Sequence, residues 1–270
     1  GTQSQPVVLP QILTPGLVRS SIDDADRVAK APADGYTLLY TVGAELAMRQ
    51  SLPGSIDLLR DLTPIASVAA SVSCIVARPD LPLGSMQELL ELARRNPGKL
   101  SFASSGAGTS VHLSAELFMH MTRVEMMHIP YKGTGSAMPD LISGVVDLSF
   151  PNFPSAIPLV KSGQLRALGV TTAKRSAAAP SVPTIAESGL PGYDMATWYG
   201  LVAPANLPEA IRTRLNKELQ VVLADPKFKD KLIAQGADPM PGTADQFAQF
   251  IKSEIERWRK LIAQSNITID

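Results

Sequence analysis

The sequence has little of what marks nucleic-acid-binding and membrane-spanning proteins. Its 270 residues hold 25 Lys and Arg against 25 Asp and Glu, so the formal net charge is zero. A nucleic-acid-binding protein needs an excess of basic groups to displace counterions from phosphates, and no basic run extends beyond pairs such as Arg94–Arg95. No segment approaches the ~18–20 uninterrupted apolar residues of a membrane helix. We therefore expect neither nucleic-acid binding nor direct membrane insertion.

Cysteine and the common catalytic motifs are also scarce. The single Cys74 excludes an internal disulfide, and we expect it to be a small buried residue of a strand. A P-loop and a G-x-S-x-G nucleophile elbow are absent, and the two incomplete G-x-G-x-x-G patterns begin at Gly106 and Gly133. His112 and Glu116 lie one helical turn apart, but a hydrogen bond is favoured over a metal site because no third ligand is suggested. We expect no catalytic residues, no metal and no cofactor.

What the chain does contain is an alternation of apolar runs and helical patterns, which favours a mostly parallel sheet flanked by helices. Capping boxes at Ser85/Glu88 and Thr243/Gln246 predict the starts of two helices. The strands expected from the apolar runs are 36–42, 62–68, 73–78, 100–104, 124–129, 145–150, 165–171 and 197–203. The helices expected from 3.6-residue periodicity are 85–96, 110–121, 134–143, 208–223 and one from Thr243 onward.

Two glycine-rich turns are the segments that point to a ligand. Ser104-Ser105-Gly106-Ala107-Gly108-Thr109 follows a strand and opens a helix, and Tyr131-Lys132-Gly133-Thr134 does the same. Glycines let the backbone approach a ligand, and the first helical turn presents unpaired N–H groups and the positive end of the helix dipole. Such a turn binds carboxylates or phosphates without a charged side chain. The alternative is a capped strand–helix turn without a ligand.

These turns belong to a longer pattern that resembles a known family. From about Ala29 to the C-terminus, the chain is similar to the Bug family, the extracytoplasmic solute receptors of tripartite tricarboxylate transporters. The resemblance is carried, in the family's order, by segments 33–39 (ADGYTLL), 61–65 (DLTPI), 96–100 (NPGKL), 104–112 (SSGAGTSVH), 129–133 (IPYKG), 144–147 (GVVD), 163–168 (GQLRAL), 182–193 (VPTIAESGLPGY) and 198–204 (WYGLVAP).

The resemblance implies a fold and a function. The fold would be α/β, a two-lobed periplasmic binding protein fold (type II-like), each lobe a mostly parallel sheet flanked by helices. Residues 1–101 plus 199–270 would form lobe 1 and residues 102–198 lobe 2, closing over a ligand by a hinge. The implied function is capture of a small carboxylate (a di- or tricarboxylate, an acidic amino acid or an aromatic acid) in the interlobe cleft. The implied partners are the carboxylate and the membrane permease subunits of a tripartite tricarboxylate transporter.

The resemblance also implies the ligand contacts, residue by residue. The middle lobe would contribute its two turns and the residue after the 145–150 strand, and the first lobe would contribute the end of the 36–42 strand. The implied contacts are Ser104, Ser105, Gly106, Ala107, Thr109, His112, Tyr131, Gly133, Thr134, Asn152, Val42, Gly43 and Ala44.

The N-terminus departs from the family pattern. Gln5–Leu9 resembles the family's second strand, Pro15-Gly16 its following loop and Ile22–Lys30 the next helix, so the initial strand–turn–helix unit is missing. Either Pro6–Leu9 takes the place of the first strand, or residues before Gly1 have been lost. The start at Gly1-Thr2-Gln3-Ser4 shows no basic region or apolar block. The family's periplasmic location therefore implies a leader that has been removed.

Two other functions compete with the transport receptor. One is a regulatory or signalling family member that has lost ordinary solute capture. The other is an enzyme, such as an acyl or phosphoryl transferase built on the Ser104–Thr109 turn, which would need a general base near Ser105 such as His112. We favour the receptor. The sequence leaves open the ligand's identity, the oligomeric state and the permease served.

Overall fold

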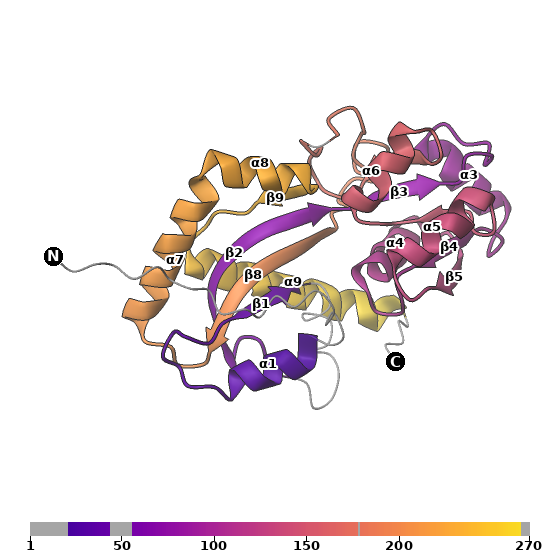
Figure 1. The fold of residues 1–270 in the computed structure, drawn as a ribbon. Coiled ribbons are helices and arrows are strands. Elements are labelled where there is room, and N and C mark those ends of the chain that lie inside the picture. Colours follow the sequence, from indigo (N-terminus) through magenta and orange to yellow (C-terminus); the bar gives the residue numbers. More distant parts are fainter. Residues whose placement is uncertain (1–20, 44–55, 178, 266–270) are drawn as a thin grey trace.

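A computed structural model describes residues 21–43, 56–177 and 179–265, which form two sheets (Figure 1). The first sheet has the strand order β1-β8-β2-β9 and the second the order β5-β4-β6-β3-β7. The first is built from β1 (Leu39–Val42), β2 (Leu62–Val72), β8 (Ala196–Pro204) and β9 (Ala237–Pro239). The second is built from β3 (Cys74–Ala77), β4 (Ser101–Ser104), β5 (Met127–Pro130), β6 (Leu148–Ser149) and β7 (Arg166–Val170).

The first sheet is antiparallel, which corrects the expectation of a mostly parallel sheet in each lobe. β2 and β8 pair antiparallel along their length, and β1 and β9 pair antiparallel with β8 and β2. The reason is that β2 and β8 run between the two sheets in opposite directions (Figure 1). More than a hundred residues separate them, so the local alternation of strand and helix carries no information on their relative direction.

The second sheet is mixed, which corrects the same expectation for the other lobe. β4 pairs parallel with β5 and with β6, as the alternation of strands and helices predicts. β3 pairs antiparallel with both β6 and β7. Only Ser73 separates β3 from β2, so the chain passes directly from the first sheet into the second. No helix connects β3 to a parallel neighbour in the way that α4 connects β4 to β5.

The strand pairing bears on where the lobes divide. β3 and the helix α3 (Met86–Arg95) belong to the second sheet's part of the molecule, although the expected boundary at residue 101 assigns them to lobe 1. The division itself stays a prediction. Pairing favours a first boundary near Ser73, between β2 and β3, and a second near Met195, just before β8.

The helices agree with the expected pattern where capping and periodicity were clear. Ser85 caps α3 through the full capping box with Glu88, and Thr243 and Gln246 exchange the same two hydrogen bonds at the last helix. The Ile22–Lys30 expectation is confirmed as α1. The other helices are α1 (Ser21–Ala29), α4 (Ser110–Thr122), α5 (Thr134–Ser143), α6 (Phe153–Lys161), α7 (Glu209–Ala224), α8 (Pro226–Ala234) and α9 (Ala244–Ser265).

Sequence patterns missed two helices and one short strand. α6 carries Pro154 and Pro158, and α8 begins at Pro226 directly after α7. Prolines inside a periodic pattern normally end a helix, although the first helical turn tolerates them because its N–H groups have no intrahelical partner. Asp225 accepts a hydrogen bond from the Phe228 N–H, so Asp-Pro was the signal for α8. β9 is too short to show a pattern.

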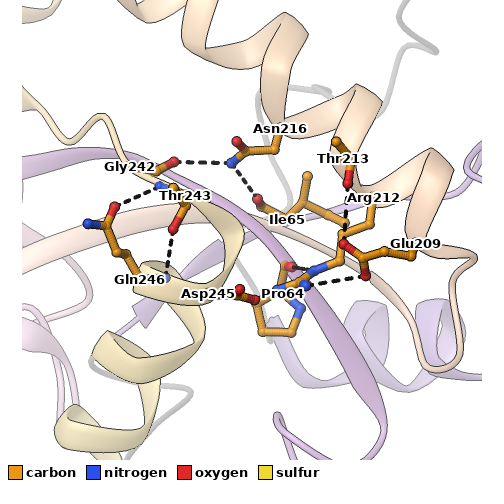
Figure 2. Close-up of polar contacts among 10 residues, drawn as sticks. All are labelled: Pro64, Ile65, Glu209, Arg212, Thr213, Asn216, Gly242, Thr243, Asp245 and Gln246. Atoms are coloured by element: carbon orange, nitrogen blue, oxygen red, sulfur yellow. Dashed lines mark hydrogen bonds and ion pairs between the residues drawn. The ribbon is translucent and has the colours of Figure 1, made fainter.

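A polar clamp fastens α7 to the first sheet (Figure 2). The side-chain amide of Asn216 donates to the carbonyl of Ile65 at 2.9 Å and to that of Gly242 at 3.1 Å. The Arg212 Nε donates to the carbonyl of Pro64 at 3.1 Å. These bonds fix α7 relative to β2 and to the segment that enters α9. None of the helices in the described ranges is long and apolar enough to cross a membrane.

Candidate functional site

Three parallel strands of the second sheet end at one edge, and each leads into a helix. β5, β4 and β6 lie side by side, and α5, α4 and α6 begin just after them at Thr134, Ser110 and Phe153. At none of these helices does the N-cap side chain hydrogen-bond to the first turn. The sheet edge therefore gathers helix N-termini whose N–H groups and dipoles favour a negatively charged group.

The first turn, between β4 and α4, is held by its own hydroxyl groups. The Thr109 hydroxyl donates to the carbonyl of Gly106 at 2.8 Å, and the Ser105 hydroxyl donates to the Thr109 hydroxyl at 3.1 Å. Gly106 has a φ of +125°, which a residue with a Cβ rarely adopts. The backbone is thus bent into a compact loop in which Ala107 is exposed. Ser104 is buried beneath it.

His112 supports this turn from the first turn of α4. Its Nδ1 accepts the N–H of Gly108 at 3.0 Å, and its Nε2 lies 3.2 Å from Oε1 of Glu116. An Nδ1 that accepts places the ring proton on Nε2, which donates to Glu116. Only 6% of His112 is exposed, and both ring nitrogens have partners within the protein. The predicted direct contact of His112 with a ligand stays a prediction, and the geometry shows a supporting position.

His128 on β5 is a second histidine of the site that the sequence did not single out. Its Nε2 lies 2.6 Å from the Ser104 hydroxyl, and its ring stacks on that of His112 with centroids 4.0 Å apart. Burial, and next the neighbouring His112, lower the pKa of His128 to about 4. His128 and Ser104 lie on the sheet face that α4 covers, because the register pairs His128 with Phe102. That register is visible only once the strand pairing is known.

The second turn, between β5 and α5, adjoins the first. The N–H of Tyr131 donates to the carbonyl of Ser104 at 3.0 Å. The Tyr131 hydroxyl donates to Oδ2 of Asp140 on α5 at 2.7 Å, which raises the pKa of Tyr131 to about 12. The phenol is therefore neutral and its orientation is fixed. The Gly133 carbonyl accepts the Ser136 hydroxyl at 2.8 Å.

The third helix start lies beside the strands that connect the sheets. The Ser73 hydroxyl donates to Oδ1 of Asn152 at 3.0 Å, and the two residues form an isolated antiparallel bridge. Next to them, the buried Thr171 hydroxyl contacts the carbonyls of Ser73 at 3.1 Å and Met195 at 2.6 Å. Thr171 thus fastens the points where both connecting strands meet the second sheet.

The opposite wall of the expected cleft is described only in part. Val42 is half-buried at the end of β1 that lies toward the second sheet, because it pairs with Tyr199 near the start of β8. Gly43 is packed against the indole of Trp198, where a Cβ would overlap the ring. Trp198 is itself fixed by a 3.1 Å hydrogen bond from its Nε1 to Glu254. Ala44 and the expectations for residues 5–16 lie outside the described residues.

The structure brings the expected contacts of the middle lobe to one sheet edge. Both turns and Asn152 lie along the same edge of the second sheet, whereas Val42 and Gly43 lie at the end of β1 in the first sheet. That these residues contact a ligand stays a prediction. Sequence reasoning missed Ser73, His128 and Thr171, whose roles depend on strand pairing. In the described part of the chain, no three His, Cys, Asp or Glu side chains are grouped so that they could hold a metal ion.

Comparisons with known proteins agree with this architecture. The family model described as tripartite tricarboxylate transporter family receptor matches residues 4–267. Protein BugT of Bordetella pertussis is 37% identical over 243 residues, covering 89% of this chain and 74% of BugT. These matches extend over both sheets.

Solved structures give the same result. The structure of R. palustris Rpa4515 with adipate is 36% identical, with a TM-score of 0.78 and coverage of 90% of this chain and 82% of that one. MatC (Rpa3494) from Rhodopseudomonas palustris with bound malate is 28% identical, with a TM-score of 0.73 and coverage of 89% and 84%. The fold is that of periplasmic binding proteins, and the family is one of transport receptors rather than enzymes. This chain belongs to the tripartite tricarboxylate transporter receptor family, in which the Bug proteins are found.

Proposed function

We propose that this protein captures a small dicarboxylate in a periplasmic cleft between its two sheets and presents it to the permease subunits of a tripartite tricarboxylate transporter. The observation that carries the proposal is the convergence of α4, α5 and α6 on one edge of the second sheet, with no side-chain cap from their N-cap residues. Their N–H groups supply the hydrogen bonds that a carboxylate accepts.

The chemistry of the edge favours a carboxylate bound by neutral groups. The turns supply backbone N–H groups, and neither turn contains an arginine. Relatives that are 36% and 28% identical are described with adipate and with malate, which are both dicarboxylates. A chain with a carboxylate at each end fits a cleft in which the second carboxylate meets the first sheet. Val42 and Gly43 lie at that side.

A ligand panel tests this proposal by calorimetry and thermal shift. We expect adipate, malate or a related dicarboxylate to bind saturably and to raise the melting temperature by mass action. The uncharged diamide of each acid serves as the matched ligand control and should not bind. No shift with any acid of the panel would refute solute capture and favour a regulatory family member.

A pair of glycine variants places the ligand on the proposed edge. Gly106→Ala and Gly163→Ala both put a Cβ at positive φ, +125° and +74°, without a close steric contact. Both should lose about 1–2 kcal/mol of stability. Only Gly106→Ala should also weaken dicarboxylate binding, because Gly106 lies in the first turn and Gly163 follows α6. Equal effects on binding would move the site elsewhere.

A further inference from the structure

We propose that His112 is a positioning residue of the carboxylate site, and that its Nδ1, as the acceptor for the Gly108 N–H, holds the first turn in its binding shape. The inference rests on the proposed function, since it concerns the same turn. His112 takes the role of an internal brace, reaching the ligand through Gly108 rather than by direct contact.

The supporting contact is a single hydrogen bond to Gly108, a residue whose positive φ favours glycine. Gly108 has a φ of +73°, and its buried N–H has the Nδ1 of His112 as its acceptor at 3.0 Å. Gly108 lies one residue before the N-cap Thr109, so its position sets the direction of the N–H groups that open α4. A buried N–H that loses its acceptor destabilises the conformation that contains it. Losing the Nδ1 acceptor therefore loosens the part of the turn that a carboxylate would contact.

The surroundings of the ring determine which nitrogen accepts. Glu116, on the same helix, lies 3.2 Å from Nε2 and accepts a hydrogen bond from it, which leaves the lone pair on Nδ1 for the Gly108 N–H. The ring is also held by its neighbours, because His128 from β5 stacks on it with centroids 4.0 Å apart and Phe102 from β4 with centroids 6.2 Å apart.

The two ring nitrogens allow a matched pair of variants. In His112→Asn the side-chain oxygen can occupy the place of Nδ1 and accept the Gly108 N–H. In His112→Gln the amide reaches the place of Nε2, next to Glu116, and leaves the Gly108 N–H without an acceptor. A positioning role through Gly108 predicts that the Asn variant binds adipate about tenfold more tightly than the Gln variant. A direct ligand contact through Nε2 predicts the reverse order, and a role in packing alone predicts equal losses.

A ligand-free measurement keeps this inference separate from the proposed function. Nitrogen chemical shifts of the His112 ring report its tautomer, and the Gly108 amide resonance reports the turn. We expect the proton on Nε2 in the wild type, and a Gly108 amide that exchanges with solvent faster in His112→Gln than in His112→Asn. If no acid binds the wild type, but the tautomer and the Gly108 exchange rates are as expected, the proposed function fails and the positioning role of His112 is retained. A proton on Nδ1 would refute the brace whatever the ligand result.

Discussion

Gly43→Ala offers the sharpest test of how the end of β1 is built. A Cβ at Gly43 would overlap the indole of Trp198, which is 1% exposed and hydrogen-bonded to Glu254 at 3.1 Å. Overpacking a filled core costs about 1–3 kcal/mol, and losing a hydrogen bond to a charged group costs about 1.5–3 kcal/mol. We expect the variant to lose about 3–5 kcal/mol of unfolding free energy without any ligand present, and its melting temperature to fall by about 10 °C.

The assay is guanidinium unfolding followed by tryptophan fluorescence, since the chain has two tryptophans and Trp198 is one of them. Gly135→Ala is the matched control, because an added Cβ there meets nothing within 4 Å and the residue lies inside α5. That variant should keep its unfolding free energy within about 1 kcal/mol of the wild type, because Gly135 lies in the first turn of α5. Identical midpoints for Gly43→Ala and wild type would show that Gly43 is open to the cleft rather than packed against Trp198.

Three further predictions concern the second sheet. Thr171→Val should lower the free energy of unfolding in urea by about 1–3 kcal/mol, because the fully buried hydroxyl contacts the carbonyls of Ser73 and Met195. Thr172→Val on the neighbouring residue should lower it less, and equal losses would refute the fastening role of Thr171. Asp140→Asn should lower the pKa of Tyr131 from about 12 toward its usual value, as followed by NMR of labelled tyrosine, and an unchanged pKa would remove Asp140 as the cause. Burial holds the pKa of His128 near 4 in the folded state, against 6.5 when it is exposed, so the unfolded chain binds more protons between these values. Stability should therefore be complete above about pH 6.5 and decline as the pH falls to about 4, and His128→Gln should flatten that decline in unfolding midpoints measured across the range; an undiminished slope would assign the acid loss to other groups.

The sequence predicted the local features of the fold because their causes are local. The capping box at Ser85, the periodicity of the 110–121 helix and the glycine-rich turns all act within a few residues. Strand direction is different, because it depends on which strands meet. β2 and β8 pair over more than a hundred residues of separation, and their antiparallel pairing followed from no local pattern.

The candidate site divides in the same way. The two turns were visible as Gly-rich segments between a strand and a helix. The contacts beneath them depend on register: His128 meets Ser104 because β5 lies parallel to β4 with Phe102 beside His128. Ser73 and Thr171 gain their roles from the antiparallel pairing of β3 with β6 and β7. Gly43 was predicted as a ligand contact from its place at the end of a strand. The contact that the structure describes for it is with the core residue Trp198.

The central claim is that backbone N–H groups at the edge of the second sheet hold a carboxylate. The most direct measurement is a titration of the nitrogen-labelled protein with adipate, followed through its glycine amides. We predict saturable shifts for Gly106, Gly108 and Gly133 in the turns, and none for Gly98 and Gly163, which lie after α3 and α6. Saturable binding that moves Gly98 or Gly163 and leaves the turn glycines unchanged would contradict the account.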